Sequence, residues 1–326
     1  MSCTLDTVLL LALPASGKSE VRRFLASLPP KVCREEFHMG PTTQLDDYPY
    51  VHMMRRIDDE LALLGAQRLF FKSPEQPFRD QRDWGTLIEL LNEDYEDLVH
   101  RNVRTASSYA GLLFERMDSA AQRAGAEVKL GRLPEGVLAR LRDRLEAEAK
   151  KVSDDKHAEY PESLEGRTVV IEFARGGPDG ATMPLPAPLG YRYSLALLSP
   201  RILERASILY VWVTPEESRR KNFERADPNN PGSILHHGVP LEVMLKDYGC
   251  DDMEWLIGQS DRPDTVKIEA HGRTWYLPVA RLDNRVDKTS FVRSPNWREE
   301  DVATLRSALA RTMDVLMRAV AANKGC

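Results

Sequence analysis

The segment that most constrains the fold is residues 12–19, which read Ala-Leu-Pro-Ala-Ser-Gly-Lys-Ser. A largely apolar run, residues 6–13, leads into it, and such a run predicts a parallel strand that is buried on both faces. After Gly17, apolar residues recur at helical spacing as far as the proline pair at 29–30. The chain is therefore expected to open with a strand, a glycine turn and a helix.

The same eight residues match the pattern of a phosphate-binding P-loop, except that Ala12 stands where the first glycine is usual. In such a loop successive backbone N–H groups converge on a phosphate, and the following helix N-terminus adds positive potential. The pattern assigns Lys18 to the β- and γ-phosphates of a nucleotide and Ser19 to Mg²⁺. We therefore expect ATP and Mg²⁺ as cofactors. The expected nucleotide-binding residues are Pro14, Ala15, Ser16, Gly17, Lys18, Ser19 and Glu20.

Periodicity divides the rest of the chain into a helical middle part and a second strand-rich part. A weaker strand is expected over residues 32–38, followed by a loop over 39–49. The expected helices are 50–65, 84–101, 108–124, 134–152, one beginning at 214–215, and 299–320. The expected strands are 167–174 and 206–214, with a hairpin of 265–270 and 273–279.

These elements predict an α/β fold of the P-loop NTPase type, with three layers around a central, mostly parallel sheet and a large helical insertion. Residues 1–49 would form the first part of the core and residues 50–155 the insertion. Residues 156–326 would form the second part, with a lid region and a C-terminal helix.

Amino-acid composition indicates which classes of partner and which cellular compartment to expect. The 45 basic and 50 acidic residues give a net charge of -5, which disfavours nucleic acid as a partner. No stretch approaches the roughly 20 apolar residues of a membrane helix. The four cysteines are scattered, without the spacing of a zinc site or a disulfide framework, so we expect a reducing, cytoplasmic compartment.

The strand over 206–214 leads into Pro215, two acidic residues and spaced basic residues. With the P-loop, this unit resembles the P-loop kinases of nucleosides, nucleotides and other small molecules. In that family the arginines of this helix form a mobile lid over the phosphates. The resemblance implies Arg219 and Arg225 as catalytic contacts, beside Arg220 and Lys221 as further lid cations. The alternative is that these residues form one solvated helical face.

The segment Asp46-Asp47-Tyr48-Pro49-Tyr50 is similar to an acidic-aromatic loop of uridine-kinase-like and phosphoribulokinase-like enzymes. There an aspartate takes the proton from the acceptor hydroxyl. The resemblance implies Asp47 as the catalytic base, with Asp46 as second choice. An Asx-type turn that caps the next helix is the alternative.

Glu172 lies at the carboxyl end of the strand expected over 167–174, where α/β sheets place ligands. It would bind Mg²⁺ through water, or serve as the base in place of Asp47. A carboxylate inside so apolar a run requires a partner, because an unpaired buried charge is costly. Arg175 is expected as that partner or as a phosphate ligand.

Two further features carry weaker expectations. His236 and His237 are adjacent and lack a third ligand nearby, which disfavours a metal site and favours a place in a substrate loop or a turn. The kinase resemblance implies a nucleotide contact for Asn284. The helical insertion is longer than that of a minimal nucleotide kinase, so it would form an acceptor lid, a homodimer surface or a protein-partner module.

The sequence thus predicts an ATP-dependent phosphotransferase that acts on a hydroxyl-bearing small molecule, for example a nucleoside or a sugar-like acceptor. The alternative is a nucleotide-dependent ATPase switch or assembly factor, in which Glu172 activates water and the insertion reports to a protein partner. A kinase of nucleic-acid ends is disfavoured by the acidic pI of about 5.9.

Overall fold

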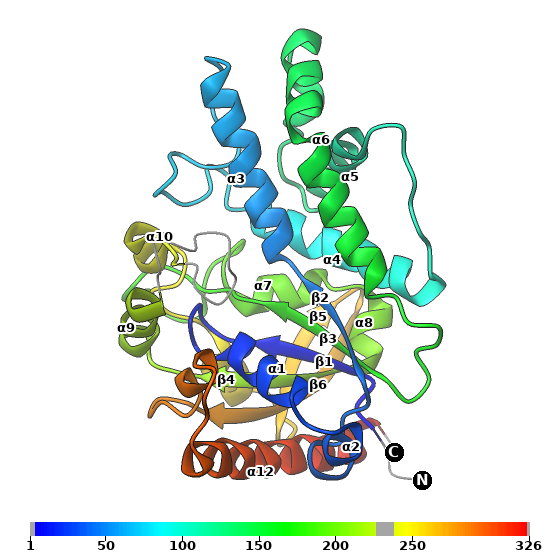
Figure 1. Cartoon of the computed structure of the whole chain (residues 1–326). Helices are drawn as coiled ribbons and strands as arrows, with labels where there is room; N and C mark the ends of the chain where they lie inside the picture. Colours follow the sequence, from blue (N-terminus) through cyan, green and yellow to red (C-terminus); the bar gives the residue numbers. More distant parts are fainter. Residues whose placement is uncertain (1–3, 226–237, 325–326) are drawn as a thin grey trace.

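The computed structural model describes residues 4–225 and 238–324, and within them it confirms an α/β fold with a mostly parallel sheet (Figure 1). The six strands lie in the order β2-β3-β1-β4-β6-β5. Only β5, at one edge, runs antiparallel to its neighbour. The strands are β1 (Thr7–Leu11), β2 (Thr42–Asp46), β3 (Thr168–Phe173), β4 (Ala206–Trp212), β5 (Thr265–Ala270) and β6 (Arg273–Asp283).

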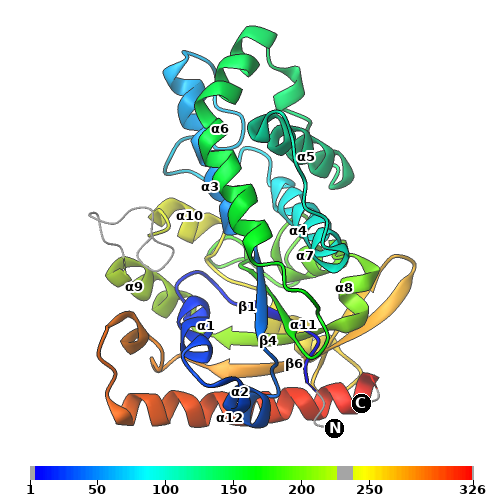
Figure 2. The ribbon, with the colours of Figure 1, turned by 45° about the vertical axis from the view of Figure 1, so that its right-hand side comes forward.

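Helices cover both faces of the sheet, because the central strands are apolar on both sides. Val8 and Leu10 of β1 point to one face, and Leu9 and Leu11 point to the other. The first face carries α1 (Lys18–Ala26), α2 (Pro30–Phe37) and α12 (Glu299–Lys324), as Figure 2 shows. The second carries α4 (Asp83–His100), α7 (Gly190–Leu197), α8 (Pro200–Arg205) and α11 (Met253–Gln259).

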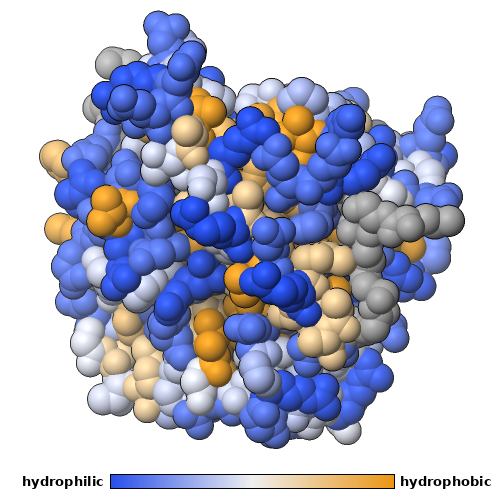
Figure 3. Space-filling view, turned by 90° about the horizontal axis from the view of Figure 1, so that it is seen from below, coloured by the Kyte–Doolittle hydropathy of each residue, from blue (hydrophilic) through white to orange (hydrophobic). Residues whose placement is uncertain are grey.

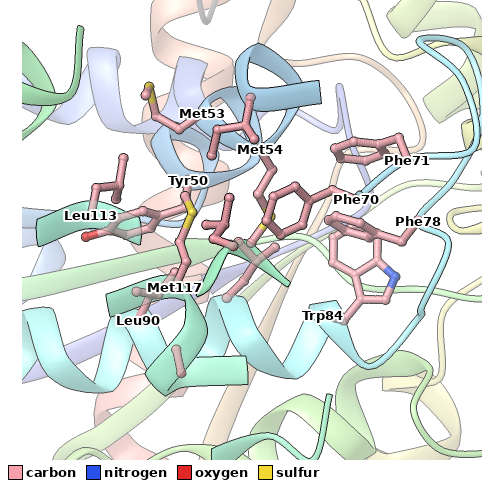
Figure 4. Close-up of a cluster of buried hydrophobic side chains, with 14 of the residues drawn as sticks. Tyr50, Met53, Met54, Phe70, Phe71, Phe78, Trp84, Leu90, Leu113 and Met117 are labelled. Carbon is pink, nitrogen blue, oxygen red and sulfur yellow. The ribbon is translucent and has the colours of Figure 1, made fainter. Parts of the chain in front are cut away.

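The expected helical insertion is present as α3 (Tyr48–Leu63), α4, α5 (Tyr109–Arg123) and α6 (Glu135–Ala158). Figure 1 shows α3 and α6 projecting from the sheet as two arms. The helices share a core with aromatic residues of the loop before α4, drawn in Figure 4. Helix α4 joins this core to the sheet: Leu87 and Leu90 pack inside the insertion, and Ile88 and Leu91 pack on the sheet.

The remaining helical elements lie in the second half of the core or in connecting loops. They are α9 (Pro215–Arg225), α10 (Leu241–Lys246), and the 3-10 helices η1 (Leu130–Arg132) and η2 (Ser290–Arg293).

The expected strand over 32–38 is wrong, as is the expected loop over 39–49. Residues 30–37 form α2, and β2 occupies Thr42–Asp46 instead. Pro30 suits the first helical position, and Cys33 and Phe37, four residues apart, are both buried on one helix face. In β2 only Thr43 and Leu45 are buried, the alternation of an edge strand.

The parallel register brings the carboxyl ends of five strands to one edge of the sheet, and residues 12–19 lie there, directly after β1. No helix of the described ranges is long and apolar enough to cross a membrane. The side of the molecule away from the projecting arms is mainly hydrophilic, with hydrophobic residues in small groups (Figure 3).

Candidate functional site

The 12–19 loop connects β1 to α1 and is held by its own side chains. The ammonium group of Lys18 donates to the carbonyl oxygens of Ala12 at 3.1 Å and Leu13 at 3.3 Å. The hydroxyl of Ser16 also donates to Leu13, at 2.7 Å. Ala15 and Gly17 both adopt positive φ angles, 57° and 109°. The carbonyl oxygens of Ala12 and Leu13 thus accept hydrogen bonds from side chains of the same loop.

Two residues from the far end of the sequence support the same loop. The hydroxyl of Ser218 in α9 donates to the carbonyl of Pro14 at 2.7 Å. The amide of Asn284, which is fully buried after β6, donates to the carbonyl of Ser16 at 2.8 Å and to the Thr289 hydroxyl at 2.9 Å. Its oxygen accepts from the backbone of Lys288. The Asn284 side chain therefore helps to hold the loop, and the nucleotide contact expected for Asn284 stays a prediction.

The loop presents backbone donors that no other described residue uses. Within residues 4–225 and 238–324, the N–H groups of Ala15, Ser16 and Gly17 have no acceptor. A side chain at Gly17 would place Cβ 2.5 Å from the Thr289 hydroxyl and 2.9 Å from the Asn284 amide nitrogen. Close packing and φ therefore both require glycine here. Unpaired amides beside a helix N-terminus fit an anion such as a phosphate.

Glu172 and Asp46 form an acidic pair at the carboxyl ends of β3 and β2. They are direct neighbours in the parallel register. Arg22 of α1 donates to Glu172 at 2.6 Å and lies 3.4 Å from Asp46. The buried carboxylate of Glu172 thus has Arg22 as its partner, and the expectation of Arg175 in that role is wrong.

Asp47 pairs with Arg175 instead, at 2.7 Å. Arg175 is only 2% exposed, and it also donates to the Ser194 hydroxyl and the Trp84 carbonyl. Asp47 precedes α3 but makes no capping hydrogen bond, whereas Asp46 accepts from the backbone of Tyr48 at 2.8 Å. The Asx turn therefore belongs to Asp46, and Arg175 fixes the orientation of the Asp47 carboxylate.

Burial raises the pKa of each of the three carboxyl groups at this edge. For Asp46 and Glu172 the negative charge of the other group raises the pKa further, while Arg22 opposes the shift. For Asp47 the guanidinium of Arg175 is the main opposing influence, and Lys18 contributes in the same direction. Groups with raised pKa values are better proton acceptors once ionised, as a general base requires.

Hydroxyl and carboxylate oxygens are the donors that Mg²⁺ prefers, and Ser19, Asp46, Asp47 and Glu172 line one cavity. No group of three or more acidic, histidine or cysteine residues in the described chain is arranged to hold a metal on its own. Mg²⁺ commonly binds through one or two protein oxygens plus phosphates and water, so these residues fit that mode. Ser19 and Glu172 remain the residues that would hold it.

Arg219, Arg220 and Lys221 of α9 do not line this cavity. Arg219 lies 3.5 Å from Asp179 and 3.4 Å from Glu216. Arg220 is half-exposed and pairs with acidic residues of its own helix. Lys221 is fully buried, with its ammonium 2.8 Å from Asp287, so its expected place in a lid is wrong in this arrangement.

Three of the expected site residues are not placed by the structure. Arg225 ends α9, but its side chain lies outside the described residues, as do His236 and His237.

Glu20 lines the cavity as expected, and its buried carboxylate accepts a hydrogen bond from Arg293 at 2.6 Å. This contact ties the first turn of α1 to η2.

One cavity joins the loop to the insertion. Lys18, Ser19, Asp47 and Glu172, which were predicted from three separate segments, all line it. It contains about 990 Å³ of space, part of which is open solvent. Apart from Tyr48, sequence reasoning missed its other end, which consists mainly of aromatic side chains with one arginine and one aspartate. These residues are Tyr48, Arg55, Phe71, Phe78, Trp84, Asp247 and Tyr248. They come from distant segments, and no local motif links them.

A scan against known protein families finds no match to this chain, and a search of curated proteins finds none either. The function must therefore be argued from the site, because an α/β sheet by itself serves many activities.

Proposed function

We propose that the protein is an ATP-dependent phosphotransferase of the P-loop kinase type, acting on a hydroxyl-bearing small molecule. The observation that carries this proposal is that one cavity is lined by residues 15–17 and Lys18 of the loop, by Asp47 and Glu172, and by a group of aromatic side chains. The loop end suits the phosphates of ATP. The aromatic side chains would hold the acceptor. Asp47 connects the two groups of residues, because Lys18 influences its pKa and its partner Arg175 lies over the Trp84 ring.

Each group of residues that lines the cavity would have its own role in phosphoryl transfer. The amides of residues 15–17 and the ammonium of Lys18 would stabilise the negative charge of the transferring phosphoryl group. Asp47, held by Arg175, would accept the proton of the acceptor hydroxyl. At the same time the hydroxyl oxygen would bond to the γ-phosphorus, and the bond between that phosphorus and ADP would break. Mg²⁺, bound by Ser19 and Glu172, would supply charge neutralisation between the phosphates. Glu172 is the alternative base.

The lid role of Arg219 and Arg225 remains part of the proposal and requires α9 to move. Among the described residues, Arg219 contacts partly exposed acids at 3.4–3.5 Å, but a movement of α9 would also break the Ser218–Pro14 hydrogen bond and the buried Lys221–Asp287 pair. The two described cysteines, Cys33 and Cys250, are free thiols, which supports a reducing, cytoplasmic location.

A nucleotide-dependent switch is the second candidate, and one feature favours it. Helix α3 begins directly after Asp47, and its other end projects from the molecule beside α6 (Figure 1). A nucleotide-dependent shift of Asp47 would therefore be transmitted along a rigid helix to a protein partner or a second copy of the chain. This candidate predicts ATP hydrolysis that a protein partner accelerates and small molecules do not.

The deciding experiment measures ADP release by the purified protein with ATP and Mg²⁺ against pools of nucleosides, sugars and related alcohols. Acceptor-dependent ADP release that is lost in Lys18→Ala would support the kinase. Lys31→Ala is the matched control, because the Lys31 side chain is 81% exposed on α2, away from the cavity. Tight ATP binding without acceptor stimulation in any pool would instead favour the switch, and activity of Lys18→Ala at the wild-type rate would contradict both.

A further inference from the structure

The aromatic end of the cavity is a rigid, flat-walled pocket. Phe71 and Phe78 stack with ring centroids 4.4 Å apart, and Trp84 meets Phe78 edge-on at 4.8 Å. Figure 4 shows these three rings grouped at one side of the insertion core. Tyr248 approaches Trp84 at 5.6 Å from the other part of the chain. Such walls favour a planar ring, which can stack on or meet them edge-on.

Asp247 adds an unexplained polar group to this pocket. Its side chain lines the cavity and is 1% exposed, yet neither carboxylate oxygen has a hydrogen-bond partner among the described residues. The Gln81 amide approaches closely enough to lower the pKa of the carboxyl without reaching hydrogen-bonding geometry, and burial still raises that pKa to about 7. A buried acceptor without a donor destabilises the free protein. A ligand that donates to it would remove this penalty.

The charge on the same wall indicates which donor fits. Arg55 lines the cavity, with its guanidinium 4.0 Å from the centre of the Phe71 ring and hydrogen-bonded to the Pro74 carbonyl. Its positive charge disfavours a second cation nearby. A neutral N–H group therefore suits Asp247 better than an ammonium does.

We propose that the aromatic pocket binds a neutral, planar, nitrogen-containing ring of the acceptor, and that Asp247 selects it by accepting its N–H donors. This inference rests on the proposed kinase function only in calling the ligand an acceptor. Asp247 is a specificity residue, distinct from the groups that handle the phosphates. Ligand recognition then explains a side chain that costs stability in the empty protein.

The test uses two fragments of equal size, 2-aminopyrimidine and 2-methylpyrimidine, of which only the first carries N–H donors. Binding to the full chain is measured at pH 8 by calorimetry, without ATP. Wild type is expected to prefer the amino compound by about tenfold or more, the worth of a hydrogen bond to a charged group. Asp247→Asn should lose most of this preference, and Asp143→Asn, an exposed change on α6, should keep it.

The stability of the Asp247→Asn variant without ligand distinguishes a ligand-binding role from a structural role, because the two roles predict opposite changes. If Asp247 serves the ligand, Asp247→Asn leaves the stability of the empty protein at pH 8 unchanged or raised. A large stability loss in that variant would overturn the proposal, and so would equal binding of both fragments to wild type.

The two proposals fail separately, because fragment binding needs no phosphoryl transfer. A fragment preference that persists in Lys18→Ala, with no acceptor phosphorylated by wild type, would reject the kinase and retain the ring pocket. If wild type phosphorylates an acceptor that has no nitrogen-containing ring, and shows no preference between the two fragments, the ring pocket is rejected and the kinase is retained.

Discussion

Replacing Gly17 with alanine should destabilise the protein more than any strain in its φ angle explains. A positive φ costs an alanine about 1 kcal/mol. The new Cβ would also lie 2.5 Å from the Thr289 hydroxyl and 2.9 Å from the Asn284 amide nitrogen. That amide donates hydrogen bonds to the Thr289 hydroxyl and to the Ser16 carbonyl. Losing two such hydrogen bonds adds about 1 kcal/mol each, so the expected loss is roughly 3 kcal/mol.

Gly65→Ala is the matched control, because Gly65 has φ of 71° but no atom within 4 Å of an added Cβ. Its expected loss is only the backbone cost, about 1 kcal/mol. Urea unfolding of both variants measures the difference. Thr289→Ala in the Gly17→Ala background should recover part of the loss, since it removes the nearest atom. Equal losses in the two glycine variants, or no recovery, would refute the steric argument.

Three further outcomes are expected. Asp58→Asn should lower the free energy of unfolding by about 2–3 kcal/mol in a urea titration, because the buried carboxylate accepts the backbone N–H groups of residues 69–71. Arg175→Met should cost about 3–5 kcal/mol at pH 7, since it leaves Asp47 buried without its partner, and less at pH 4, where Asp47 can be protonated. The pKa of Asp247 is about 7 in the folded protein against an ordinary 3.8, so the folded state holds the extra proton between these values. Stability should therefore fall as pH rises from 4 to 7, by up to roughly 4 kcal/mol from this group, and pH-dependent unfolding of Asp247→Asn should show a shallower slope.

Local pattern was enough to predict most of the secondary structure and to select several residues that line the cavity. The buried runs that became β1, β3 and β4 are apolar on both faces, so periodicity located them. It failed at α2 and β2, because short segments with few apolar residues fit either a helix or a strand until their packing is known. Lys18, Asp47 and Glu172 were predicted from motifs, and the cavity contains all three.

The sequence by itself determined the opening strand, glycine turn and helix, because a glycine and a lysine at fixed offsets are a local property of the chain. Only the tertiary structure decided which charges pair. Arg22 reaches Glu172 across 150 residues, and Arg175 reaches Asp47 across 128. It also decided that Asn284 holds the loop and that, among the described residues, the Asp247 carboxylate has no hydrogen-bond partner in the aromatic pocket. These facts depend on strand register and on how the insertion packs on the sheet, and neither can be predicted from a short segment of the sequence.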